Sequence, residues 1–413
     1  MEDHHLFSVS WLTQRANVST VARNPGPRHL KGPLMTTSST TSQPYTSEPQ
    51  TSGLQSDEPR VRDVVSQLPG YVAGRRATGD LTAALASNES HYEPLPAVLD
   101  VVQRTAGRMN RYPDMAATEL RERLADFLGV ESTAVSVGPG SVGVLQQILT
   151  ATCGPGDQVV FAWRSFEAYP ILVSLTGAIP VPVPLDANEA HGLDAMLAAI
   201  TEDTRVVMVC SPNNPTGVAL EHDALGDFLA KVPTHVLVVI DEAYTEYLDA
   251  TETLDALALF RAHNNVCVLR TFSKAYGLAG LRVGYAVAHP NLAEALRRVA
   301  LPFGVSTLAQ QAAIASLEAQ EQLRERVGAV VSERRRMVAA LRQAGWDVPD
   351  SQANFVWLRA GENLRQALVD AFDRSDVLVR AYAGDGVRIT LADPATNERV
   401  LEVLKDRSAF PAA

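Results

Sequence analysis

Short apolar runs alternate with helical stretches through the middle of the chain. The runs AVSV (134–137), QVVFAW (158–163), RVVMVCS (205–211), HVLVVID (235–241) and VCVLR (266–270) are apolar at successive positions. Strands that are buried on both faces of a parallel sheet have this pattern. Their alternation with helices predicts an α/β fold built on one large, doubly wound and mostly parallel sheet. In such sheets ligands bind at the carboxyl ends of the strands.

The pattern changes at both ends of this region. Residues 1–60 are rich in Ser, Thr, Pro and Gln and lack periodic apolar positions, so we expect a disordered tail, and Met35 is an alternative start of translation. After about residue 300, a long helical stretch (317–344) precedes the apolar runs NFVWLR, DVLVRAY and GVRIT. Helices and strands in this order predict a second, smaller α+β domain.

Composition excludes several functional classes. The 413 residues carry a formal net charge of −11, which argues against nucleic acid or an anionic membrane as the main partner. Cys153, Cys210 and Cys267 are far apart, so we expect neither disulfides nor a zinc site but free thiols in a reducing cytoplasm. We expect no signal peptide, because the first residues lack a hydrophobic segment and a small-residue cleavage site.

Two loops after predicted strands carry candidate binding groups. The strand AVSV runs into a glycine-rich turn and a helix start, where the amides of Gly140, Ser141 and Val142 can point at a phosphate. An ordinary strand-to-helix turn is the alternative. The strand RVVMVCS ends in PNNPTG, which should leave Asn213 and Asn214 exposed at the strand end. Plain turn chemistry is the alternative there.

Two further strand ends carry ionisable groups. Asp241 follows five apolar residues, where a carboxylate needs a partner, although capping a helix would also explain it. Lys274 stands alone among small, hydroxyl and apolar residues, and desolvation would lower its pKa and make it a nucleophile. A lysine that reaches out to solvent is the alternative. Thr271, Ser273 and Arg282 add two hydroxyls and a guanidinium that suit a phosphate.

One cofactor would use all four strand ends. Pyridoxal phosphate has a phosphate for the glycine-rich loop, Ser273 and Arg282, and an aldehyde for Lys274. Its ring nitrogen needs a carboxylate, and its phenolic oxygen would suit Asn214 and Tyr244. We therefore expect a pyridoxal phosphate site and no metal site.

These motifs resemble the class I and II, fold-type I, pyridoxal phosphate-dependent aminotransferases, in the group of histidinol-phosphate and aromatic amino acid aminotransferases. The resemblance covers about residues 62–410 and implies an N-terminal arm (61–95) joining the small domain, a large cofactor-binding domain (96–300) and a small C-terminal domain (301–413). It rests on the motifs LASNE (85–89), NRYPD (110–114), GSV (140–142), SPNNPTG (211–217), DEAY (241–244), RTFSKAYGLAGLR (270–282), ANFVWL (353–358) and GVRIT (386–390).

The resemblance also implies roles for single residues. Lys274 corresponds to the Schiff-base lysine and proton-transfer base, and Asp241 to the partner of the ring nitrogen. Asn214 and Tyr244 would hold the phenolic oxygen, and Trp163 would stack on the ring. The phosphate would be held by Ser273, Arg282, the amides of Gly140, Ser141 and Val142, and Tyr112 of the neighbouring subunit.

On the substrate side, the resemblance assigns Arg388 to the substrate carboxylate. It places Tyr71, Asn88, Asn354 and Arg380 along the rest of the pocket. The implied protein is a cytoplasmic homodimer with shared active sites that exchanges an amino group between an L-amino acid and a 2-oxo acid, with 2-oxoglutarate as the general acceptor.

The sequence favours an aromatic donor, phenylalanine first, over histidinol phosphate. Val142 and Phe166 stand where histidinol-phosphate enzymes usually have an acidic residue and a tyrosine, so the pocket wall is drier. The combination of LASNE, WRSFE and SQANFVWL also resembles the actinobacterial aromatic branch. Arg380 and Tyr71 argue the other way, because they match phosphate-side positions of the histidinol-phosphate enzymes.

Two other classes remain alternatives. A pyridoxal phosphate-binding transcriptional regulator would carry a DNA-binding domain, but the first 60 residues show no basic, amphipathic helix pair. A decarboxylase of the same fold would share these motifs, and release of carbon dioxide would distinguish it.

Overall fold

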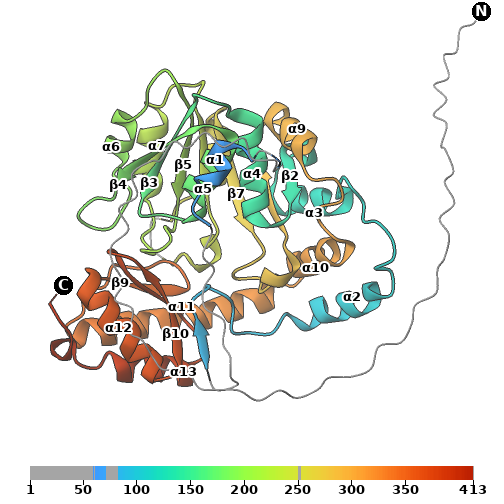
Figure 1. Ribbon diagram of the computed structural model, residues 1–413. Coiled ribbons are helices and arrows are strands. Elements are labelled where there is room, and N and C mark those ends of the chain that lie inside the picture. Colours follow the sequence, from blue (N-terminus) through green and yellow to red (C-terminus); the bar gives the residue numbers. More distant parts are fainter. Residues whose placement is uncertain (1–58, 60, 71–81, 250–252, 413) are drawn as a thin grey trace, which may run out of the picture. The chain divides into compact units, whose positions relative to one another are not determined.

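The computed structural model describes residues 59, 61–70, 82–249 and 253–412. Arg60–Ala413 form one compact unit, and Figure 1 shows its two sheets. The predicted disordered tail lies outside the described residues except for Pro59, and so does Tyr71. The boundaries predicted for the N-terminal arm (61–95), the large domain (96–300) and the small domain (301–413) remain predictions.

The larger sheet has seven strands in the order β2-β8-β7-β6-β5-β3-β4. β8 pairs antiparallel with both β2 and β7, and the other neighbours are parallel. This arrangement confirms the predicted α/β fold class. The strands are β2 (Val135–Gly138), β3 (Gln158–Trp163), β4 (Ile179–Pro184), β5 (Thr204–Cys210), β6 (Leu237–Asp241), β7 (Val266–Thr271) and β8 (Gly284–Val287).

Both faces of this sheet are buried, as the continuous apolar runs predicted. Alternate residues of one strand belong to different hydrophobic clusters: Val207 and Val209 of β5 pack on one face, while Val206 and Met208 pack on the other. This alternation follows from the two-residue period of a strand.

Two strands of this sheet were not among those that the sequence predicted. β4 reads IPVPVP, and its prolines are tolerated because it lies at the sheet edge and pairs only with β3. β8 is only four residues long, too short for a clear apolar pattern.

Helices cover the large sheet, and several begin where the sequence places a cap or a proline. In α8, for example, the Asp255 side chain accepts the Ala258 amide, and Pro290 occupies the first turn of α9. The helices that precede α11 along the chain are α1 (Asp63–Ser66), α2 (Pro96–Ala106), α3 (Thr118–Leu128), α4 (Gly140–Thr152), α5 (Ala168–Thr176), α6 (Leu193–Ala198), α7 (His222–Leu229), α8 (Ala256–Ala262), α9 (Pro290–Val299) and α10 (Thr307–Glu318). Short 3₁₀ turns are η1 (Ser132–Ala134), η2 (Thr245–Tyr247), η3 (Ala279–Leu281) and η4 (Arg407–Ala409).

The smaller sheet joins segments from opposite ends of the described chain. β1 (Ala83–Leu85) pairs in parallel with β10 (Val377–Tyr382), which pairs antiparallel with β11 (Gly386–Thr390), and β11 pairs with β9 (Phe355–Arg359). In Figure 1 the blue β1 lies beside the red strands for this reason. The accompanying helices are α11 (Gln320–Gln343), α12 (Glu362–Arg374) and α13 (Pro394–Val403).

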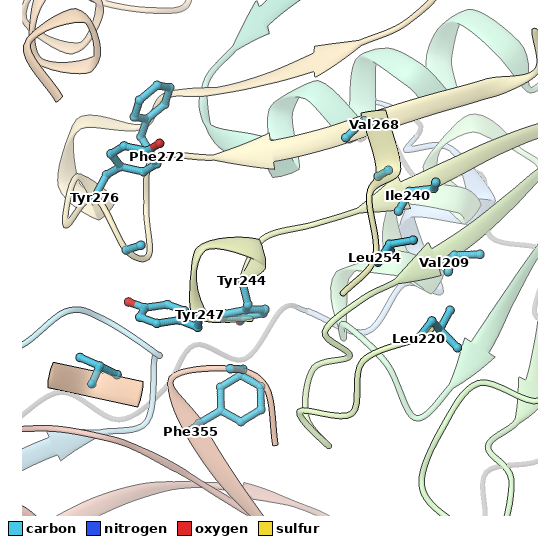
Figure 2. Packing of buried hydrophobic residues seen from close by; sticks show 14 of the residues in the cluster. Val209, Leu220, Ile240, Tyr244, Tyr247, Leu254, Val268, Phe272, Tyr276 and Phe355 are labelled. Carbon is cyan, nitrogen blue, oxygen red and sulfur yellow. The ribbon is translucent and has the colours of Figure 1, made fainter. Parts of the chain in front are cut away.

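Aromatic side chains connect the two sheets. Tyr244 follows β6 of the large sheet and meets Phe355 of β9 edge to face, with ring centroids 5.1 Å apart. Figure 2 shows this contact beside Tyr247, with Ile240 and Val268 on the neighbouring strands of the large sheet. The contact joins the carboxyl end of β6 to the small sheet. Among the described residues, the helices are all too short or too polar to cross a membrane.

Candidate active site

A cavity of about 350 Å³ lies where the carboxyl ends of the large-sheet strands meet the small sheet. This is the position that ligands take in open α/β sheets. Thirteen residues that the sequence predicted for the site line it together: Asn88, Ser141, Val142, Phe166, Asn214, Asp241, Tyr244, Thr271, Ser273, Lys274, Arg282, Arg380 and Arg388.

Lys274 follows β7 and reaches into this cavity. Its Nζ donates a hydrogen bond to the Ser87 carbonyl at 3.0 Å and lies 5.9 Å from the centroid of the Tyr244 ring. Desolvation, together with the positive charges of Arg388 and Arg282, lowers the pKa of Lys274 to about 7, although Glu89 opposes the shift. A large share of the amine is therefore neutral and nucleophilic near pH 7.

Asp241 is the last residue of β6 and is buried at the floor of the cavity. Its Oδ2 accepts the Tyr169 hydroxyl at 2.8 Å, while its Oδ1 is buried without a hydrogen-bond partner among the described residues. Burial raises the pKa of Asp241 to about 6, although the Tyr169 hydrogen bond opposes this shift. The orphaned oxygen suits a cationic N–H group from a ligand.

The amino end of α4 and Arg282 form a cradle for an anion. Gly140 begins α4 with φ +74°, and a Cβ at this position would collide with the Arg282 guanidinium. Arg282 also donates to the Ser273 hydroxyl at 3.5 Å. Ser141 and Val142 of the first turn line the cavity beside them. Free amides at a helix start and a guanidinium are the groups that hold a phosphate.

Two asparagines connect the remaining side chains. Asn88 donates to the Tyr244 hydroxyl at 2.9 Å, and burial raises the pKa of that phenol. Arg388 donates to Asn214 Oδ1 and, at 2.6 Å, to the Ala86 carbonyl. Because both of these acceptors are uncharged, the positive charge of Arg388 stays available for a ligand anion.

These features fit a cofactor with three kinds of group. The cradle takes an anionic group, the Asp241 carboxylate takes a cationic ring N–H, and Lys274 takes a carbonyl carbon. The described residues contain no group of three or more His, Cys, Asp or Glu side chains that could bind a metal ion.

Asn213 differs from the sequence expectation of an exposed strand end. It is fully buried, and its side chain bonds to Ser165, His191 and Thr216 instead of facing the cavity. Asn213 therefore stabilises the turn, and Asn214 alone of this pair lines the cavity.

Trp163 is not among the residues that line the cavity. Its ring packs near Phe161, with centroids 6.1 Å apart, and the Arg164 guanidinium covers it at 4.4 Å. Trp163 and Phe161 share one face of β3, whereas the chain turns after the strand and brings Phe166 to the cavity wall. This geometry does not support the prediction that Trp163 stacks on the cofactor ring. Phe166, which lines the cavity, is better placed for such stacking.

Three other predicted residues also stand apart from the cavity lining. Gly140 contributes through its contact with Arg282, and Asn354 donates to the Asn88 carbonyl at 3.2 Å from behind. Tyr112 is 82% exposed and packs on Phe303, with ring centroids 4.6 Å apart, in a separate groove.

The structure adds residues that the sequence did not indicate. Tyr169 bonds to Asp241 across 72 positions of the chain, and Glu167 pairs with Arg380 across 213 positions. Tyr382 also lines the cavity. No local pattern could reveal these pairs, because the folded sheets bring their members together.

Comparison with known proteins gives a consistent result. A family model described as aminotransferase class I and II matches residues 83–404. An aromatic amino acid aminotransferase of Streptomyces avermitilis is 52% identical over 84% of this chain and 96% of its own length. A second, from Streptomyces coelicolor, is also 52% identical, over 84% of this chain and 97% of its own. The crystal structure of histidinol-phosphate aminotransferase from Sinorhizobium meliloti in complex with pyridoxal-5'-phosphate has a TM-score of 0.77 at 29% identity, covering 84% of this chain and 96% of that one.

Proposed function

The chain belongs to the class I and II aminotransferases, and from this premise we propose that it transfers an amino group between an aromatic L-amino acid, phenylalanine first, and 2-oxoglutarate. Curated relatives about half identical over most of the chain carry the name aromatic amino acid aminotransferase. The histidinol-phosphate enzyme of known structure is more distant, at 29% identity.

The cofactor that we propose is pyridoxal phosphate. The orphaned Oδ1 of Asp241 fits its pyridinium nitrogen, and the α4 cradle with Arg282 and Ser273 fits its phosphate. Lys274 would hold its aldehyde carbon, and Asn214 with Tyr244 its phenolic oxygen. When bound, this cofactor supplies an electron sink for the bonds of the substrate α-carbon.

The residues of the chain then have separable tasks. Asp241 would keep the ring nitrogen protonated, because its buried carboxylate has an oxygen without a hydrogen-bond partner among the described residues. Lys274, whose pKa of about 7 lets it exchange protons near neutrality, moves a proton at the substrate α-carbon. Arg388 binds the substrate α-carboxylate with a guanidinium that Asn214 and the Ala86 carbonyl orient.

The preference for an aromatic donor rests on the apolar part of the cavity wall. Phe166 lines the cavity and meets Tyr169 edge to face at 5.6 Å. A phenyl wall stabilises an aromatic side chain but leaves the polar atoms of an imidazole without partners. Asn88 and Arg380 complete the substrate side, and Asn354 supports it by donating a hydrogen bond to the Asn88 carbonyl.

The enzyme that we propose is a homodimer with shared active sites. Met109 and Phe303 are exposed apolar side chains that line the same groove as Tyr112, and Met115 and Leu301, which line another cavity, are exposed as well. A second copy that covers this surface would bring Tyr112 toward the neighbouring phosphate cradle. The cysteines are free thiols, which fits a reducing compartment, and we propose the cytoplasm.

A panel of amino donors with 2-oxoglutarate tests the function. Glutamate formation is measured with the cofactor-loaded protein, and kcat/KM is determined for phenylalanine and for histidinol phosphate. We expect kcat/KM for phenylalanine to exceed kcat/KM for histidinol phosphate by roughly tenfold or more, because the imidazole would lack hydrogen-bond partners in this pocket. A histidinol-phosphate value above that of phenylalanine would overturn the donor assignment, and release of carbon dioxide without glutamate would indicate the decarboxylase alternative.

A further inference from the structure

Two arginines of the active-site cavity occupy directly paired positions on neighbouring strands. Arg380 of β10 and Arg388 of β11 are register partners in the antiparallel hairpin, and both line the cavity. Side chains opposite each other on one sheet face are close neighbours, so like charges there repel. This site therefore needs negative charge close to the pair, from the protein or from a ligand.

The two guanidiniums are compensated differently. Arg388 donates to the uncharged oxygens of Asn214 and Ala86. Arg380 instead forms an ion pair with Glu167, whose Oε2 lies 2.5 Å from Nη2 and 3.1 Å from Nε. The two paired side chains are only 10% and 27% exposed, so water screens this ion pair little.

Glu167 reaches Arg380 from the aromatic side of the cavity. It directly precedes α5 and follows Phe166, and both residues line the cavity. Tyr382 lies beside both arginines, with its ring centroid 5.6 Å from the Arg380 guanidinium carbon and 5.8 Å from that of Arg388. The phenyl wall and the negative charge that compensates Arg380 therefore come from adjacent residues of one turn.

We propose that Glu167 is a specificity-determining residue that occupies Arg380 and so selects substrates with one anionic group. A substrate with a single carboxylate binds Arg388 and leaves the Glu167–Arg380 pair intact. A substrate with a second anion, such as a dicarboxylate or a phosphate monoester, must displace the Glu167 carboxylate to reach Arg380. The inference deepens the proposed function and rests on it, since it treats this cavity as the substrate site.

The proposal also explains how the two substrates of the reaction are treated. A phenylalanine side chain needs no charge at Arg380, and the intact ion pair leaves none exposed to it. The second carboxylate of 2-oxoglutarate has to compete with Glu167, so its binding is weakened without being abolished. Discrimination of this kind uses a competing internal group as well as favourable contacts.

The direct test measures ligand binding to the holoenzyme by titration calorimetry. Glutarate carries two carboxylates, and 3-phenylpropionate is the matched ligand with one carboxylate and a phenyl ring. In Glu167→Gln, which keeps the side-chain length, we expect the Kd of glutarate to fall by roughly tenfold or more. The Kd of 3-phenylpropionate should change by less than about threefold, because Arg388 is untouched.

Two further variants show that the gain acts through Arg380. Adding Arg380→Gln to Glu167→Gln should remove the gain in glutarate affinity. Asp385→Asn is the matched control, because it removes the carboxylate that pairs with the neighbouring Arg164, and neither of these residues lines the cavity. This control should leave the ratio of the two Kd values unchanged.

Steady-state kinetics supply the second readout. In Glu167→Gln, kcat/KM should rise for glutamate and for histidinol phosphate relative to phenylalanine. An unchanged glutarate Kd, or a parallel loss for both ligands, would overturn the role of Glu167. Wild-type protein that transaminates no aromatic amino acid would refute the proposed function, yet the two Kd values would still decide between a competing Glu167 and a merely structural one.

Discussion

At the residue scale, the two oxygens of the Asp241 carboxylate lie in different surroundings. One accepts the Tyr169 hydroxyl at 2.8 Å, and the other is buried without a partner among the described residues. An unpaired buried oxygen is costly, and a cationic ring nitrogen is the partner that would satisfy it. Such a partner would also lower the pKa of Asp241 from about 6 and keep it ionised.

Replacing this charge should therefore cost activity and leave the fold intact. We expect Asp241→Asn to lose on the order of 10²–10³-fold in kcat, because the ring nitrogen loses its anionic partner. The thermal midpoint should change little, since the amide fills the same space. Tyr169→Phe, which keeps the charge, should lose far less. A decrease below tenfold for Asp241→Asn would mean that another group holds the ring proton.

The low pKa of Lys274 gives a second prediction at this scale. In protein stripped of cofactor, a small aldehyde and a mild reductant label neutral amines, and peptide mass spectrometry reports each site. Below pH 7 the Lys274 amine is protonated, so its labelling should rise as pH passes about 7 and then level off.

Lys405 provides the control for this titration. It is exposed and pairs with Glu402, which raises its pKa above the ordinary lysine value. Its labelling should continue to rise through the alkaline range. If Lys274 followed the same curve as Lys405, the desolvation that we infer around Lys274 would be wrong.

At the scale of elements, the start of α4 works as a unit with the segment after β7. Gly140 adopts φ +74°, and its missing side chain leaves room for the Arg282 guanidinium. A side chain in this left-handed conformation costs about 1–2 kcal/mol, and the collision would also displace Arg282 from the cradle. The conformation of the helix start and the position of the Arg282 guanidinium therefore both require glycine at position 140.

Gly140→Ala should weaken cofactor retention more than it weakens the fold. We expect the dissociation constant of the cofactor to rise by roughly tenfold or more, because an anion loses a charge-assisted contact. Equilibrium dialysis measures this constant, and calorimetry measures the thermal midpoint. Gly328→Ala in α11, where a Cβ meets nothing within 4 Å, should leave the constant unchanged. Equal retention in both variants would contradict the cradle.

At the scale of the whole molecule, the Tyr112 groove stands outside the cavity. Tyr112 is 82% exposed although it carries a large aromatic ring, and Phe303 beside it is 42% exposed. Exposed apolar side chains gathered in one region mark an interaction surface. The proposed second copy would bury them and bring Tyr112 to the other active site.

Mixed dimers test this arrangement. Lys274→Ala and Tyr112→Ala each spoil a different half of the same composite site, so each homodimer should have little activity. After mixing and subunit exchange, a hybrid should carry one intact site, and random pairing gives about a quarter of wild-type activity. Hybrids that form and stay inactive would refute the shared site.

The sequence by itself determined most of the large sheet and the chemistry at its edge. Continuous apolar runs mark β3, β5, β6 and β7 because strands buried on both faces carry apolar residues at successive positions. Asp241 and Lys274 were recognisable because an ionisable group at the end of an apolar strand is costly to bury unless it has a partner or a function. Weak or short patterns left β4 and β8 unrecognised.

Only the tertiary structure decided which neighbours these groups have. The turn after β3 leaves Trp163 out of the cavity lining, and Asn213 turns inward while Asn214 faces the cavity. The Glu167–Arg380 pair joins residues 213 positions apart. Local patterns report burial and period, whereas partners across two sheets depend on how distant segments pack, and that information is not contained in any one stretch of the chain.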